Sequence, residues 1–118
     1  MKKKTTISDI FEKISGSIIY STNRLAEFEL RRVDGAFEVH RIDTITNTTL
    51  EAWVFGILRE KDIVQKRRYA LLKKLPGGGV AAVGVYGSLE EVLNNINAIL
   101  LTRGIIRGFS MEDLARLS

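Results

Sequence analysis

The stretch KRRYALLKKLPGGGVAAVGVYGSLEEVLNNINAILLTRG, residues 66–104, decides the fold that we expect. Two runs of β-forming residues flank the turn sequence Pro76–Gly79, and a helical pattern follows them. Because proline and glycine between two apolar runs favour a turn, the pattern predicts that Arg67–Leu75 and Val80–Tyr86 pair as a β-hairpin.

The expected pairing across Pro76–Gly79 assigns each side chain of this hairpin to a face. A tight loop at these four residues places Leu75 opposite Val80 and Tyr69 opposite Tyr86. One face is then apolar apart from Lys74 near the turn: Ala70, Leu72, Ala81, Val83 and Val85. The other face mixes aromatic, aliphatic and basic residues: Arg67, Tyr69, Leu71, Lys73, Leu75, Val80, Ala82, Gly84 and Tyr86.

Two helices are predicted after this hairpin. Ser88 and Glu91 form a capping box, and apolar residues follow at helical spacing up to Gly104, a natural C-terminal cap. Ser110 and Asp113 form a further capping box, which predicts a short terminal helix.

The other clear hairpin is Leu25–Asp43, which turns at Asp34-Gly35. A two-residue Asp-Gly turn predicts that Val33 pairs with Ala36, and the register follows from that pair. One face is then expected to be core: Phe28, Leu30, Phe37 and Val39, with arginines toward its ends. The charged face, which includes Arg31, Glu38 and His40, is expected to face solvent, so we interpret His40 as a surface residue.

The segment between the hairpins is ambiguous. Thr48 and Glu51 match a capping box, and apolar residues from Leu50 to Leu58 fall at helical spacing, so we expect a helix over Thr48–Arg59. The β-branched and aromatic content and Gly56 suit a buried strand equally well. A strand here would give a five-stranded sheet.

Residues 1–5 form a basic arm, and residues 6–118 are expected to form a single domain that opens with a helix from Thr6 to Ser15 or Tyr20. The predicted order is α-β-β-α-β-β-α-α. The expected fold class is therefore α+β, with two layers: a four-stranded antiparallel sheet of two hairpins and helices on one face.

Composition excludes several functions. The chain has no cysteine and one histidine, so thiol catalysis, disulfides and thiolate or multi-histidine metal sites are excluded, and we expect no metal and no cofactor. No serine has a catalytic sequence around it, and the glycine-rich loop precedes a strand rather than the helix of a phosphate-binding loop, so we expect no enzyme activity.

No apolar run has membrane-spanning length, which favours a cytoplasmic protein. Few glutamines and many charged and isoleucine residues are typical of thermophile proteins.

A formal net charge of +4 and a pI near 9.6 favour an acidic partner. The mixed face of the second hairpin, with Tyr69 and Tyr86 beside Arg67 and Lys73, has aromatic rings to stack bases and cations to contact phosphates. Other basic residues could widen this surface: Arg31, Arg32, Lys66, Arg68 and Lys74. We therefore predict binding of single-stranded nucleic acid, DNA rather than RNA, with little sequence specificity. The alternative is that the same face is covered by a helix or forms a protein interface, as in a homodimer.

Small basic domains of long antiparallel strands and helices, with aromatic and basic sheet residues, are found among archaeal single-stranded DNA-binding proteins. In layout and composition this chain resembles the ThermoDBP kind and, more distantly, the PC4 and Whirly families. The resemblance implies single-strand binding with little sequence preference, commonly by a dimer. It includes no residue motif, so no binding residue is carried over from these families.

Overall fold

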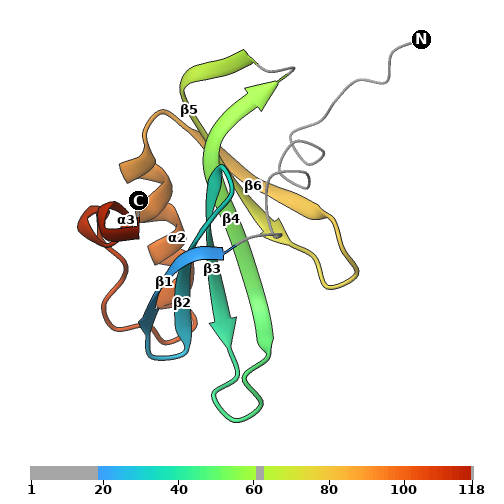
Figure 1. The fold of residues 1–118 in the computed structure, drawn as a ribbon, viewed down its shortest axis with the longest axis vertical. Helices are drawn as coiled ribbons and strands as arrows, with labels where there is room; N and C mark the ends of the chain where they lie inside the picture. The colour runs from blue at the N-terminus through green and yellow to red at the C-terminus, as the bar shows by residue number, and fades with distance from the viewer. Residues whose placement is uncertain (1–18, 61–62, 118) are drawn as a thin grey trace.

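A computed structural model describes residues 19–60 and 63–117 of the chain, and the predicted N-terminal arm and most of the first helix lie outside them. The described part contains six strands and two helices (Figure 1). The strands are β1 Ile19–Leu25, β2 Phe28–Val33, β3 Ala36–Ile42, β4 Thr49–Glu60, β5 Ile63–Lys74 and β6 Val80–Tyr86. The helices are α2 Leu89–Leu101 and α3 Met111–Leu117.

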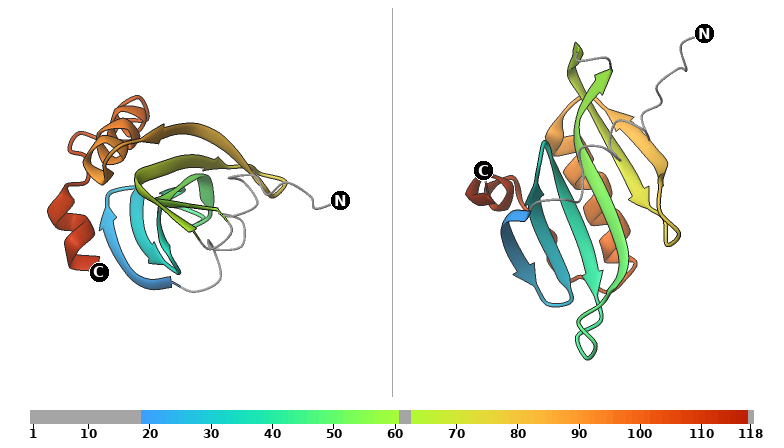
Figure 2. Two further views of the ribbon diagram at one scale, coloured as in Figure 1. Left: turned by 90° about the horizontal axis from the view of Figure 1, so that it is seen from above. Right: turned by 45° about the vertical axis from the view of Figure 1, so that its right-hand side comes forward.

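The strands form one antiparallel sheet in chain order, β1-β2-β3-β4-β5-β6, so the fold is a six-stranded meander followed by two helices. The sheet is curved, and α2 and α3 lie on the same side of it (Figure 2). The prediction of a four-stranded sheet with a helix between its hairpins was therefore wrong. Two strands were missing from it, β1 and β4, and the longer version of the first helix overlapped Ile19 and Tyr20 of β1.

The β2–β3 hairpin has the predicted register. Val33 pairs with Ala36, Leu30 pairs with Val39, and Gly35 occupies the turn with φ 73°. A positive φ favours glycine, so the short turn and its register follow from the local sequence.

The prediction of a helix at Thr48–Arg59 was wrong, because this segment is the long strand β4. Successive residues of β4 enter two different cores: Trp53 and Phe55 pack on the helix side, and Val54 packs on the opposite face. A strand buried on both faces is apolar at nearly every position, so its periodicity also fits a helix. The matched capping residue Thr48 instead belongs to a turn, in which its carbonyl accepts the Asp43 N–H at 2.8 Å.

Strands β5 and β6 form the predicted hairpin. The predicted residue pairs are correct only at the end of the hairpin that is distant from the loop. Tyr69 pairs with Tyr86 as expected, whereas Leu72 pairs with Ala82 rather than Val83. Val83 is the extra residue of a β-bulge, which shifts the register of every pair nearer the loop.

Both predicted helices are present with their capping boxes. The Ser88 hydroxyl accepts the Glu91 N–H at 3.1 Å, and the Glu91 carboxylate accepts the Gly87 N–H at 3.2 Å. The apolar stripe of α2 is buried against the sheet, and α3 reaches the edge strand β1, where the Ser21 hydroxyl donates to the Leu117 carbonyl at 2.8 Å. No helix in the described part of the chain is long and apolar enough to cross a membrane.

The sheet carries buried residues on both faces. The helix-side core contains side chains from β2 to β5 together with those of α2 and α3, centred on Phe28, Leu30, Trp53, Phe55, Leu71 and Ile96. The opposite-face cluster contains Val33, Ala36, Val54, Ala70 and Leu72. The helices therefore cover one face, and smaller side chains fill the other.

Asn97 connects α2 to the segment that leads into α3. Its side-chain amide donates to the Phe109 carbonyl at 2.7 Å, and its oxygen accepts the Phe109 N–H at 2.9 Å. The Asn97 side chain occupies the space that a Cβ on Gly108 would need, so glycine is required there. This amide fixes the loop that places Phe109 in the core.

We expect Asn97→Ala to lower the free energy of unfolding by about 1–3 kcal/mol, because both backbone groups of Phe109 lose their partner. Urea denaturation followed by circular dichroism measures the change. Asn94→Ala, at an exposed position of the same helix, is the control and should leave stability nearly unchanged. Equal stability of the two variants would contradict this account.

Candidate binding pocket

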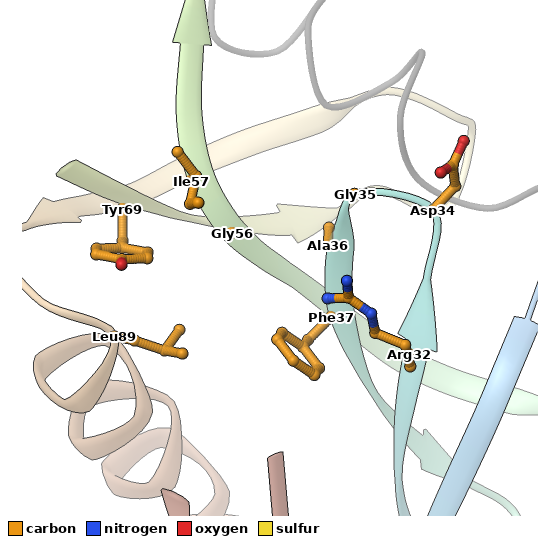
Figure 3. Close-up of a pocket in the computed structure, with 9 residues that line it drawn as sticks. All are labelled: Arg32, Asp34, Gly35, Ala36, Phe37, Gly56, Ile57, Tyr69 and Leu89. Atoms are coloured by element: carbon orange, nitrogen blue, oxygen red, sulfur yellow. The ribbon is translucent and has the colours of Figure 1, made fainter. Parts of the chain in front are cut away.

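A pocket of about 520 Å³ opens on the helix side of the sheet, at the N-terminal end of α2. Its walls come from four strands and the helix: Arg32, Phe37, Ile57, Tyr69 and Leu89. Figure 3 shows Tyr69, Ile57 and Leu89 on one side of the hollow and Phe37 with Arg32 on the other. The β2–β3 turn and Gly56 complete the lining. Its size falls in the range of pockets that hold small organic ligands.

Close approach of two backbones shapes this end of the sheet. At Gly56, β4 passes so near the β2–β3 turn that a Cβ would lie 3.2 Å from the Gly35 carbonyl oxygen. A side chain at position 56 would therefore press on the Asp34-Gly35 turn, which follows the β2 residues Arg32 and Val33. Ile57, the next residue of β4, is 43% exposed and forms part of the pocket wall.

Arg32 is the charged group of the pocket interior. Its guanidinium carbon lies 4.9 Å from the centre of the Phe37 ring, a cation–π contact, and the two residues are paired across β2 and β3. Phe37 in turn stacks on Phe55, with ring centres 5.6 Å apart. Within the described part of the chain, the Arg32 side chain has no hydrogen bond or ion pair, so no described residue occupies the N–H groups of its guanidinium.

The structure brings one predicted binding residue, Tyr69, into the pocket and places its partner Tyr86 elsewhere. Both rings pack partly against the helix-side core. Tyr86 lies over Gly84 of its own strand, where a Cβ would meet the Tyr86 hydroxyl. The predicted two-tyrosine platform is thus not an open sheet face, because α2 packs on β5 and β6.

Lys73, predicted to contact phosphate, belongs to a cluster around Glu51. The Glu51 carboxylate accepts from Arg103 Nε at 3.0 Å, Lys73 Nζ lies 3.6 Å from it, and Arg41 Nη1 lies 3.9 Å from it. Lys73 and Arg103 also lie over the Trp53 ring. The Arg103 hydrogen bond is the main cause that lowers the pKa of Glu51. Lys73 is therefore held in an ion pair rather than extended into solvent.

Lys74, also predicted to contact phosphate, pairs with a buried carboxylate. Its Nζ lies 3.3 Å from Glu38 Oε2. Glu38 is 2% exposed and His40 is 6% exposed, so the prediction that this face of the hairpin is solvated was wrong for both. Burial raises the pKa of Glu38, but the His40 hydrogen bond and the Lys74 charge outweigh it and lower the pKa overall.

The hydrogen bonds around His40 form a chain from a hydroxyl to a carboxylate. His40 Nε2 lies 2.7 Å from Glu38 Oε1 and His40 Nδ1 lies 3.0 Å from Thr49 Oγ1. Because a carboxylate only accepts, the Glu38 contact requires a donor at His40 Nε2, whereas Nδ1 and the Thr49 hydroxyl can each donate or accept. Nucleophilic catalysis uses such chains, but none of these three residues lines the pocket and Lys74 shares the carboxylate. We interpret the chain as the means by which a buried charge is satisfied.

Three predicted binding residues remain. Arg68 is exposed. Lys66 and Arg67 are part of strand β5, three and two positions before Tyr69, and their side chains are outside the described part of the chain. The described residues also contain no group of three or more acidic or histidine side chains that could hold a metal ion.

Two pocket residues were not identified as such from the sequence. Arg32 was expected only as part of a wider basic surface and Phe37 only as a core residue, whereas both line the pocket. A signal was present, because Arg32 occupies a position on the apolar face of the first hairpin, directly opposite Phe37. A charged residue within an apolar face is a departure that marks a candidate site.

Comparisons with protein-family models, curated protein sequences and solved structures give no match for this chain.

The Glu38 cluster predicts how stability depends on pH. A carboxylate whose pKa is lower in the folded state stabilises the fold above the pKa of the unfolded chain, and this contribution is lost as pH falls through the folded value. We expect the free energy of unfolding to fall below about pH 4.5, and to fall less steeply in Glu38→Gln. Urea denaturation between pH 7 and pH 3 measures both slopes, with exposed Glu90→Gln as the control. Identical slopes for Glu38→Gln and the parent protein would contradict the assignment.

Proposed function

We propose that this protein binds single-stranded nucleic acid without catalysing a reaction, and that one nucleotide of the strand enters the pocket between Tyr69 and Arg32. The observation that carries the proposal is an arginine with no acidic partner among residues 19–60 and 63–117, facing an aromatic ring across a pocket of about 520 Å³. Aromatic rings stack on bases, and arginine N–H groups donate to bases or phosphates.

The charges around the pocket support an anionic ligand. Several cations of the helix side are neutralised by Glu51, whereas Arg32 is not paired within the described residues. The sequence Lys66-Arg67-Arg68 comes directly before Tyr69, so three further cations lie close to the pocket along the chain. Together with a formal net charge of +4, they favour contacts to the phosphates of a strand that extends beyond the pocket.

A single strand suits the pocket better than a duplex does. The pocket is a hollow lined by side chains, so a base must leave its stack and its partner to enter it. The exposed face of α2 begins with two acidic residues, Glu90 and Glu91, which do not favour entry of this helix into the groove of a duplex. We propose the cytoplasm as the location.

A second candidate function is self-association, and the edge strand β6 favours it. The seven residues of β6, VAAVGVY, include no charged side chain and no proline, and Val83 and Val85 are 43% and 40% exposed. Charged side chains or proline commonly protect the edge strands of proteins from pairing with another chain, and β6 has neither. The bulge at Val83 gives it partial protection. The alternative of a homodimer therefore moves from the mixed sheet face, which α2 covers, to the edge of the sheet.

Filling the pocket tests nucleic-acid binding. We expect Ile57→Trp to weaken binding of a fluorescein-labelled single-stranded oligonucleotide at least about tenfold, or 1.4 kcal/mol, because the larger side chain occupies the space of the base. Fluorescence anisotropy measures the affinity. Ile45→Trp makes the same change at a residue that is 93% exposed on the β3–β4 turn, and it should bind like the parent protein.

A salt series completes this test. With two to four phosphate contacts, we expect log K to fall against log salt with a slope between about −1.4 and −2.8 for a single strand. Absence of binding at low salt, or equal affinities of the two tryptophan variants, would refute the proposal.

The dimer is tested separately by light scattering. If β6 strands pair between two copies, a lysine on the exposed edge should lower the measured mass toward that of one chain, because unpaired lysines block strand addition. Val83→Lys is the test variant, and Thr22→Lys on the other edge strand is the control. A single-chain mass for the parent protein at high concentration removes this candidate.

A further inference from the structure

Resting on the proposed function, we infer that the pocket selects guanine, with Arg32 donating two hydrogen bonds to the O6 and N7 acceptors of the base and Tyr69 stacking on it. Nonspecific single-strand binding does not require this preference. It follows from how the arginine is held.

The support of Arg32 leaves the edge of its guanidinium plane available. Phe37 packs against the guanidinium at 4.9 Å and is itself stacked on Phe55, so the arginine lies on a fixed aromatic wall. Arginine commonly stacks on aromatic rings through the face of its guanidinium, and in that arrangement its N–H groups remain directed outward in the plane as a rigid fork. In Figure 3 the guanidinium lies beside the hollow that Tyr69 closes on the other side.

A base edge fits this fork better than a phosphate does. Asp34 in the β2–β3 turn also lines the pocket, and Figure 3 shows its carboxylate directed away from the hollow and from Arg32. The hollow itself is walled by the rings of Tyr69 and Phe37, which suit a flat base better than a hydrated phosphate. Exposed Arg68, which does not line the pocket, is available to a phosphate of the strand.

Guanine combines a large ring system with two adjacent acceptors, and these acceptors match the two parallel donors of an arginine. Its O6 and N7 lie side by side, and arginine pairs with both. Adenine has an amino group next to N7, so one donor of the fork would face another donor. Cytosine has adjacent O2 and N3 acceptors on a single ring, which covers less of the Tyr69 ring and leaves more of the pocket empty.

The inference is tested with oligothymidylate strands that carry one central guanine, adenine, cytosine or 7-deazaguanine. Fluorescence anisotropy at one fixed salt concentration gives four affinities for each protein variant. We expect the guanine strand to bind about tenfold more tightly than the adenine strand, the gain typical of a bidentate arginine contact. We expect 7-deazaguanine, which lacks the N7 acceptor, to lose most of that gain.

Arg32→Gln should reduce the difference between the guanine and adenine strands to less than twofold. Arg107→Gln removes the same charge from the loop beyond the far end of α2 and should keep the parent's preference. Circular dichroism and thermal melting establish that both variants are folded. Arg32→Lys, which keeps the charge without the fork, should also lose the preference.

Each alternative outcome overturns the inference in a distinguishable way. Equal binding of all four strands, weakened equally by Arg32→Gln, would mean that Arg32 contacts phosphate, while single-strand binding itself would stand. Tightest binding of the cytosine strand, or full affinity for 7-deazaguanine, would show that the fork does not meet the O6 and N7 edge. If no strand binds, the proposed function fails and the guanine preference fails with it.

Discussion

Burial of β4 on both of its faces is the constraint on which the rest of the structure depends. Trp53 and Phe55 must be covered on one side, and Val54 on the other. The neighbouring strands β3 and β5 satisfy its backbone, and α2 covers the larger side chains. Because apolar burial is the main favourable term in folding, this strand organises both cores at once. The helix lies over the part of the sheet where the aromatic side chains are, and it leaves a hollow at its N-terminal end.

The same sheet also decides which charges are free. Glu38 is buried, so it needs His40 and Lys74, and Glu51 gathers Arg103, Lys73 and Arg41. The Glu51 pairs explain why a net charge of +4 does not give a continuous basic face on the helix side, and the Lys74–Glu38 pair lies on the opposite face of the sheet. Three described cations lie over aromatic rings, and two of them, Lys73 and Arg103, also pair with Glu51. Arg32 differs from these two because it has no acidic partner among the described residues.

Local signals in the sequence predicted part of this arrangement. The turn at Asp34-Gly35 gave the register of the first hairpin, and the capping boxes at Ser88 and Ser110 located both helices, because each depends on residues a few positions apart. Tyr69 was identified as a binding residue, and it does line the pocket. Tyr86 and Lys73 were assigned to an open face because strand alternation shows which side chains share a face and not what covers it. The bulge at Val83 had a weak local signal in the neighbouring Gly84, because a glycine inside a strand often marks a bulge, but it was not used in the predicted pairing.

The sequence by itself determined the turns, the helix ends, the basic charge and the α+β class, since these arise from backbone preferences and composition. Only the tertiary structure decided that Thr49–Glu60 is a strand, because an apolar run fits either a helix or a strand until both of its faces have partners. Tertiary structure also decided which cations are neutralised. Ion pairs such as Lys74 with Glu38 and Arg103 with Glu51 join residues 36 and 52 positions apart in the chain, and no local pattern encodes them. The pocket at Arg32 and Tyr69 has the same origin, because its walls meet only when the meander has folded and α2 has packed on it.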